Sequence, residues 1–203
     1  MKNMNTEELT HTIRAVHNML VDLGCDIDRI GLGIIGAQSV IGSILIDEER
    51  HPRMIQSAEV DIFVLDDNDE WADYINGTLG EGSLFHTTYG YYADGVDVHS
   101  IVLPLHWKER AVKRFWFLQD KENSAVPILF IEPHDLIVSK LHASRGKDLN
   151  FTAAMKHCFP EYIDRDKLVF SCQDLPVDIK EQKRIVKLFD ALTVEDINRN
   201  YRL

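Results

Sequence analysis

The chain has 203 residues, 45% of them hydrophobic, enough for one compact domain or for one domain with a helical appendage. Its 22 Lys and Arg against 33 Asp and Glu give a net charge of -11. Broad electrostatic binding of nucleic acid is disfavoured, because it needs clustered cations, although a local basic groove stays open. The three separated cysteines and the absence of a signal-peptide core or bilayer-length apolar run lead us to expect a cytoplasmic protein with no membrane partner.

The N-terminal quarter predicts two helices around one strand. Residues 6–23 carry apolar side chains at helical spacing and end before a glycine, as expected for an amphipathic helix. IGLGIIG, residues 30–36, predicts a strand whose small residues allow close backbone approach. A helix over about residues 38–46 follows, and the polar residues 47–56 predict an exposed loop.

The middle of the chain predicts mainly strands. SAEVDIFVL, residues 57–65, alternates apolar and polar side chains, and a helix over about residues 69–79 follows it. FHTTYGYY, residues 85–92, and GVDVHSIVL, residues 95–103, predict two strands around a turn at Asp94-Gly95. VPILFIE, residues 126–132, predicts another strand.

The C-terminal third predicts helices. Pro133 suits the first turn of a helix through DLIVSKLHA, and residues 147–158 and 178–192 are the clearest later helical segments. The order of elements predicts an α+β fold, with a mixed β-sheet flanked by helices and a C-terminal helical region. We expect the core to span residues 1–132 and the helical region to span residues 133–203.

Two acids stand out on one predicted strand. Glu59 and Asp61 are two residues apart, so their side chains leave the same face and can share a magnesium ion. Such a pair alone is most often a solvated strand face. A glycine-rich junction upstream, IIGAQSVIGS, strengthens the functional interpretation, because its backbone N–H groups can meet a phosphate. Asp97 is the best candidate for a third acid, and Asp94 is a weaker one, since Asp-Gly favours a turn.

These segments resemble a known superfamily. IIGAQSVIGS followed by SAEVDIFVL resembles the glycine-serine motif and acidic strand of the nucleotidyltransferase (polymerase-beta-like) superfamily. GVDVHSIVLPLHWKERAV and PHDLIVSKLHASRGKDLNF resemble later segments of uncharacterised bacterial nucleotidyltransferase-like proteins. That group is similar to the toxin component of abortive-infection toxin–antitoxin systems. The resemblance covers residues 30–151.

The resemblance implies a set of site residues. Glu59 and Asp61 would bind metal, and Asp61, Lys140 and Asp148 would be catalytic; Asp97, chosen from its predicted strand and not from the resemblance, is added as a metal-binding and catalytic acid. The nucleotide would be bound by Gly36, Ala37, Gln38, Ser39, Lys140 and Arg145. Ala37 stands where the superfamily carries a serine, so a phosphate-binding hydroxyl is missing, and Gln38 or Ser39 is a candidate replacement.

The cations also have a structural interpretation. Lys140 and Arg145 lie near the end of an apolar helix, where cations interact favourably with the helix dipole, and Asp148 can cap the next helix. The resemblance favours function for Lys140 and Asp148, with Lys140 offsetting the charge of the leaving pyrophosphate. For Arg145 and Lys147 both interpretations stay open. No HExxH or paired Cys/His spacing indicates a zinc site.

Two functions follow as expectations. The first is a nucleotidyltransferase dependent on Mg²⁺ or Mn²⁺ that moves a nucleoside monophosphate from a nucleoside triphosphate to RNA, a protein or a small molecule. The net charge disfavours RNA. The second is a catalytically decayed binding or regulatory module with a protein partner, as in a toxin–antitoxin pair, and Ala37 is its main support.

Overall fold

The computed structural model describes residues 4–44, 57–66, 68, 70–117 and 125–197. Its centre is a five-stranded sheet of order β3-β2-β1-β5-β4. The strands are β1 (Leu32–Ile35), β2 (Glu59–Val64), β3 (Tyr92–Gly95), β4 (Val112–Phe117) and β5 (Ala125–Phe130). The sheet is mixed, because β1 runs parallel to β5 and β2 parallel to β3, whereas β1–β2 and β4–β5 are antiparallel.

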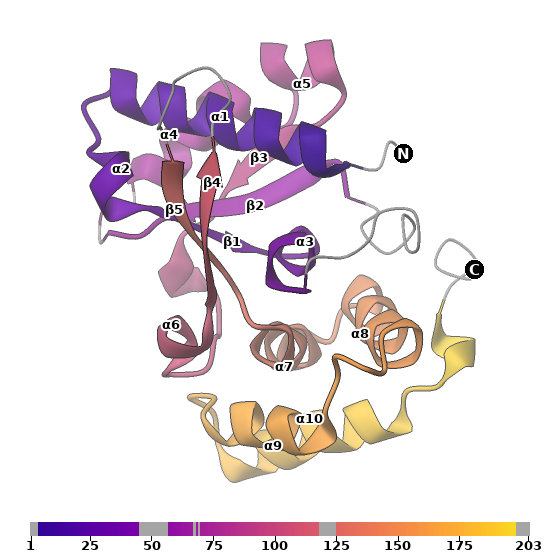
Figure 1. Cartoon of the computed structure of the whole chain (residues 1–203). Coiled ribbons are helices and arrows are strands. Elements are labelled where there is room, and N and C mark those ends of the chain that lie inside the picture. Colours follow the sequence, from indigo (N-terminus) through magenta and orange to yellow (C-terminus); the bar gives the residue numbers. More distant parts are fainter. Residues whose placement is uncertain (1–3, 45–56, 67, 69, 118–124, 198–203) are drawn as a thin grey trace.

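Helices cover both faces of this sheet (Figure 1). On one side lie α1 (Thr6–Asp22), α2 (Ile27–Ile30), α4 (Glu70–Leu79) and α5 (Leu84–Tyr89). On the other lie α3 (Ser39–Ile44) and α7 (Pro133–Ala143), which contact each other. The central strand β1 is buried at every residue, as expected for a strand paired on both sides and covered on both faces.

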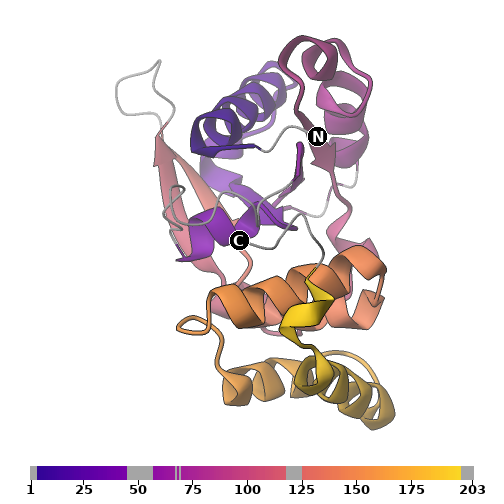
Figure 2. The same cartoon turned by 90° about the vertical axis from the view of Figure 1, so that its right-hand side faces the viewer.

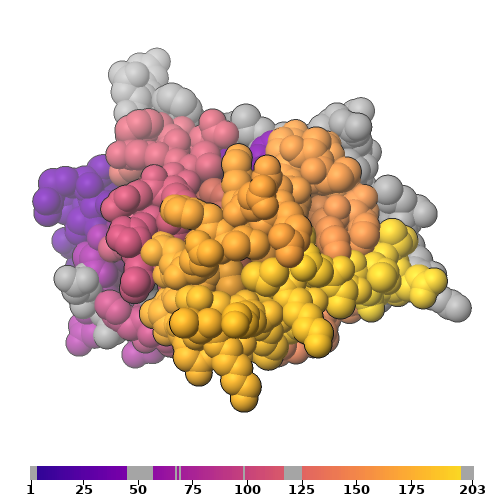
Figure 3. All heavy atoms as spheres, turned by 90° about the horizontal axis from the view of Figure 1, so that it is seen from below, coloured from indigo at the N-terminus to yellow at the C-terminus, as the bar shows by residue number. Residues whose placement is uncertain are grey.

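The C-terminal helices form a further layer against α7. They are α8 (Gly146–Cys158), α9 (Arg165–Gln173) and α10 (Ile179–Ala191), and all three contact α7. Figure 2 shows this layer beneath the sheet, and Figure 3 shows these helices covering that face of the molecule. The predicted division at residues 132 and 133 falls where Glu132 caps α7, accepting from the backbone N–H groups of His134 and Asp135. The division into two domains stays a prediction.

A buried ion-pair network ties the segment between β3 and β4 to these helices. That segment contains a short 3-10 helix, η1 (Val98–Ser100), and α6 (Trp107–Arg110). Arg110 Nε lies 2.9 Å from Oδ2 of Asp135, whose side chain is fully buried, and Arg110 Nη2 lies 2.8 Å from Asp174 Oδ2. Because Asp174 is at the end of α9, the network holds the segment against both α7 and α9.

The predicted fold class is confirmed: a mixed sheet is flanked by helices and followed by a helical region. The helices predicted near the N-terminus and after Pro133, and the strands that carry the glycines and the acids, are also present. The predicted loop at residues 47–56 and the last two residues of the 38–46 helix lie outside the described residues. No helix within the described ranges is long and apolar enough to cross a membrane.

Two strand predictions are wrong. Residues 85–92, expected to be a strand, mostly form α5, which Ser83 caps by accepting from the backbone N–H of His86 and which ends at Gly90 with φ 79°. Residues 95–103, expected to be another strand, contain η1 instead. Aromatic and β-branched residues favour strands only weakly, and in α5 the capping residues Ser83 and Gly90 outweigh that preference.

Candidate active site

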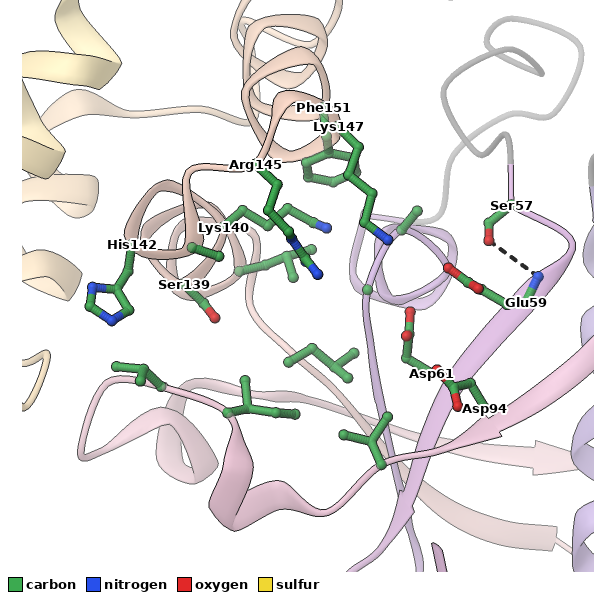
Figure 4. A pocket seen from close by; sticks show the side chains of 18 of the residues that line it. Ser57, Glu59, Asp61, Asp94, Ser139, Lys140, His142, Arg145, Lys147 and Phe151 are labelled. Carbon is green, nitrogen blue, oxygen red and sulfur yellow. Dashed lines mark hydrogen bonds between the residues drawn. The ribbon is translucent and has the colours of Figure 1, made fainter. Parts of the chain in front are cut away.

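One cavity of about 540 Å³ lies between the sheet and the helices α7 and α8. Acids of β2 and β3 form its sheet side, and cations of α7 and of the start of α8 form its helical side (Figure 4). The lining is Ile35, Gly36, Ala37, Ser57, Glu59, Asp61, Asp94, Val96, Ser100, Ile101, Val102, Leu136, Ser139, Lys140, His142, Ala143, Arg145, Lys147 and Phe151. The cavity therefore brings the predicted glycine turn and acidic strand together with the predicted cations after Pro133.

Three carboxylates share the sheet side of the cavity. Glu59 and Asp61 alternate along β2, and Asp94 is the direct register partner of Asp61 on the parallel strand β3. Residues opposite each other in neighbouring strands project from the same face of a sheet. Figure 4 shows Asp61 and Asp94 side by side, with Glu59 next along the strand.

Asp97, expected to be the third acid, lies outside the cavity lining, so the structure does not bring it together with Glu59 and Asp61. The segment that carries it is not a strand, so alternation does not carry its side chain to the face of Asp61. Its Oδ1 instead accepts from the backbone N–H of His99 at 2.7 Å, at the start of η1. Asp94 was the weaker candidate because Asp94-Gly95 predicted a turn, but it lies within strand β3. The alternation of Tyr92 and Asp94 around buried Ala93 is the local signal for that strand.

Negative charge is crowded at these acids. Burial, together with the negative charges of Glu59 and Asp94 and against the opposing charge of Lys140, raises the pKa of Asp61 to about 7. Burial and the charge of Glu59 also raise the pKa of Asp94. Glu59 accepts a hydrogen bond from the Tyr92 hydroxyl at 2.8 Å. A divalent cation or a bound proton would relieve this repulsion.

Gly36, in the turn between β1 and α3, allows the backbone to lie close to Asp61. Its φ is 74°, a region that residues with a side chain rarely adopt. A Cβ at this position would also lie 1.8 Å from Asp61 Oδ2. Only glycine therefore allows the turn to pass directly beside Asp61, which leaves Gly36 and Ala37 in the cavity wall.

Gln38 and Ser39 do not take the place of the missing serine hydroxyl. Both side chains are fully buried outside the cavity lining. Gln38 Nε2 donates to the carbonyl of Ser57 at 3.2 Å, and Ser39 Oγ donates to the carbonyl of Ile131 at 3.1 Å. The two residues predicted to bind the nucleotide therefore lie in the protein interior, Gln38 just before helix α3 and Ser39 at its first residue, and not in the cavity wall. Ser57 itself lines the cavity and was missed, since it stands at the edge of the predicted strand.

Lys140, Arg145 and Lys147 face the acids from the helical side. Burial lowers the pKa of Lys140, and the charges of Asp148 and Asp61 counteract this. Lys140 Nζ lies 4.7 Å from the centre of the Phe151 ring, a favourable cation–π distance. The cavity thus sets cations opposite acids, with room for a ligand between them.

Asp148 lies behind these cations and outside the cavity lining. Its side chain is fully buried, with Oδ2 2.6 Å from Arg145 Nε and Oδ1 3.5 Å from Lys140 Nζ. Although burial acts in the opposite direction, the Arg145 hydrogen bond and the Lys140 charge hold the pKa of Asp148 below its ordinary value. Asp148 therefore contacts the two cations Lys140 and Arg145 and does not itself reach the cavity, and its predicted catalytic role stays a prediction.

The acids suit magnesium in their chemistry. Among the described residues no three His, Cys, Asp or Glu side chains are already arranged to hold a metal ion. Mg²⁺ usually takes one or two protein carboxylates and completes its shell with water and substrate phosphates, so a preformed protein cage is not required. Glu59, Asp61 and Asp94 offer hard oxygen donors at a point of crowded negative charge.

One comparison with known proteins identifies a family for this chain. The model of a family described as "Nucleotidyltransferase of unknown function (DUF6036)" matches residues 11–202. No curated protein and no solved structure gives a significant match. The match spans nearly the whole chain, including the acids, the cations and the C-terminal helices. The chain therefore belongs to this family of nucleotidyltransferases of unknown function.

Proposed function

We propose that this protein is a magnesium-dependent enzyme that transfers a nucleoside monophosphate from a nucleoside triphosphate to an acceptor. The observation that carries the proposal is the meeting of Glu59, Asp61 and Asp94 with Lys140 across one cavity. Acids that attract a divalent ion, opposed by cations that attract phosphates, suit a nucleotide–magnesium complex. The three free cysteines, which make no disulfide, agree with action in the reducing cytoplasm.

Each group has a role in this proposal. Glu59, Asp61 and Asp94 would hold Mg²⁺, which when bound supplies positive charge to the phosphates and orients them. The acceptor oxygen bonds to the α-phosphorus while the bond from that phosphorus to the pyrophosphate oxygen breaks, and the proton of an acceptor hydroxyl passes to solvent. Lys140 offsets the charge that develops on the departing pyrophosphate, with Arg145 and Lys147 beside it. Asp148 keeps Lys140 and Arg145 in place.

The acceptor is either RNA, a protein or a small molecule. The net charge of -11 weighs against RNA, because the cations in the cavity wall serve the nucleotide phosphates in this proposal.

The second candidate function is a binding or regulatory module without turnover, paired with a partner protein as in a toxin–antitoxin system. Ala37 in the cavity wall favours it, because a serine there would place a hydroxyl at the phosphates. Ser57 also lines the cavity, and its Oγ accepts from the Glu59 backbone N–H at 3.1 Å; no described residue accepts its own proton, which can therefore be donated to a phosphate. We therefore rank the enzyme first.

The test combines binding with incorporation. Calorimetry measures binding of each nucleoside triphosphate with Mg²⁺ and with EDTA, and α-³²P-labelled nucleotides measure transfer to protein, RNA and small acceptors. We expect Mg²⁺-dependent binding and transfer in the wild type, and loss of transfer in Asp94→Asn. Asp97→Asn is the matched control, because that carboxylate lies outside the cavity, and it should keep the wild-type transfer rate.

The outcomes separate the two functions. Mg²⁺-dependent binding without transfer to any acceptor class would favour the module. No Mg²⁺-dependent nucleotide binding would refute both the enzyme and the nucleotide-binding module. Equal loss of transfer in Asp94→Asn and Asp97→Asn would refute the assignment of Asp94 as the third acid.

A further inference from the structure

The cavity has a second polar group of residues on α7, distinct from the cations. Leu136, Ser139 and Ala143 recur at spacings of three and four residues, so one face of α7 forms a continuous wall. His142, one turn after Ser139, also lines the cavity. Figure 4 shows Ser139 and His142 on the part of α7 turned away from Asp61, whereas Lys140 extends toward the acids.

His142 is held in one orientation and one tautomer. Its Nδ1 lies 2.9 Å from Glu181 Oε1, and a carboxylate can only accept, so Nδ1 carries the proton. Arg184 donates two hydrogen bonds to the same carboxylate, from Nε to Oε2 at 2.7 Å and from Nη2 to Oε1 at 2.5 Å. Its Nη2 also donates to the backbone carbonyls of Leu141 and His142. These hydrogen bonds hold the pKa of Glu181 at about 2, so it stays an acceptor. In neutral His142, Nε2 is consequently left as a hydrogen-bond acceptor.

Ser139 supplies the complementary group. Its hydroxyl makes no hydrogen bond within the part of the chain that the structure describes, although a helical serine often donates to the carbonyl four residues before it. Ser139 Oγ and His142 Nε2 are thus two hydrogen-bonding atoms, one helical turn apart, with no protein partner among the described residues. Both belong to the wall of the cavity that would hold the nucleotide.

The neighbouring lining is uncharged. Ile101 and Val102 belong to the segment that the Arg110 network holds against α7, and Leu136 and Ala143 extend the same wall. An apolar wall with a few placed polar atoms is the usual form of a site for a small organic ring. The cations of the cavity belong to the other side, near the acids, where phosphates would lie.

We propose that Ser139 and His142 form the subsite for the base of the donor nucleotide, with a base N–H donating to His142 Nε2 and Ser139 bonding to a second polar atom of the ring. This inference rests on the proposed function, because it takes the acids and Lys140 as the triphosphate site. His142 is then a specificity residue, and Glu181 with Arg184 positions it.

The experiment separates base recognition from phosphate recognition. Calorimetry on the full chain at pH 8 with Mg²⁺ compares ATP, GTP, CTP and UTP with inorganic triphosphate, which has phosphates and no base. In the wild type at least one nucleotide should bind at least about 10-fold more tightly than inorganic triphosphate. His142→Ala and Ser139→Ala should each reduce this advantage about 3- to 10-fold, the range for one lost hydrogen bond.

Two controls accompany these variants. Binding of inorganic triphosphate should be unchanged in His142→Ala and Ser139→Ala, which also shows that both variants are folded. His99→Gln changes an exposed histidine outside the cavity and should behave as the wild type. Lys140→Ala should weaken nucleotides and inorganic triphosphate alike.

Three results would overturn the inference in distinguishable ways. If inorganic triphosphate does not bind the wild type, the proposed function fails and the subsite fails with it. If triphosphate binds but nucleotides bind no better, or if His142→Ala weakens both equally, the base subsite alone is refuted. If His142→Ala leaves nucleotide binding unchanged but weakens a free nucleoside added to the nucleotide-saturated protein, the subsite belongs to the acceptor and not to the donor.

Discussion

Replacing Asp61 by asparagine should stabilise the metal-free protein while removing one carboxylate of the proposed magnesium site. Burial and the charges of Glu59 and Asp94 raise the pKa of Asp61 from 3.8 to about 7, so the folded protein resists the ionised form. The side chain of asparagine has nearly the same shape and carries no charge. The variant therefore avoids the charge repulsion with Glu59 and Asp94 that the ionised wild type sustains.

The magnitude follows from the pKa. A rise of about 3 pKa units corresponds to about 4 kcal/mol between the two protonation states, and solvent screening of a half-buried group reduces this. We expect Asp61→Asn to increase the free energy of unfolding by about 2–4 kcal/mol at pH 8, or the melting temperature by about 5–10 °C. Because the pKa of Asp61 is higher in the folded than in the unfolded protein, protonated Asp61 contributes its full stabilisation below pH 3.8. This contribution to wild-type stability is lost as the pH rises through about 7.

Urea unfolding in EDTA measures this between pH 4 and pH 8. The stability difference between the variant and the wild type should be near zero at the acidic end, grow up to pH 7 and stay constant above it. Asp97→Asn is the control and should show no such growth. A variant that is less stable than the wild type at pH 8, or a difference independent of pH, would refute the charge-crowding argument.

Three further changes test the site. Gly36→Ala should cost at least about 1–2 kcal/mol, from its φ of 74° and the contact with Asp61, and abolish Mg²⁺–nucleotide binding, whereas Gly77→Ala, in open space on α4, should slightly raise the melting temperature. Asp148→Ala should destabilise the protein by about 3–5 kcal/mol in urea unfolding, because Lys140 loses its buried partner; a loss below about 1 kcal/mol would contradict this. Ala37→Ser should tighten Mg²⁺–nucleotide binding about 3- to 10-fold in calorimetry if the phosphates lie at this turn, and unchanged affinity would place them elsewhere.

Local patterns were sufficient for much of the fold. The apolar spacing before Gly24, the glycine-rich strand and the alternation around Asp61 each report on a few neighbouring residues, and each corresponding element is present. The cations after Pro133 were also recognised, from motif resemblance. The strand predictions between Phe85 and Leu103 were wrong, because the aromatic and β-branched residues of this segment suit a strand whereas Ser83 and Gly90 cap a helix there. Only the competition between them in the folded protein decides the outcome.

The sequence by itself determined the acidic pair Glu59 and Asp61, the turn at Gly36 and the helix that carries Lys140, since these depend on residue type and short spacing. Tertiary structure alone decided that Asp94 and not Asp97 joins the acids, because the parallel register of β2 and β3 pairs residues 33 positions apart. It also decided that Glu181, 39 residues away, orients His142. The physical reason is common to both: a strand pairing or a helix contact over such distances leaves no periodic signal in the chain and is set by how the elements pack.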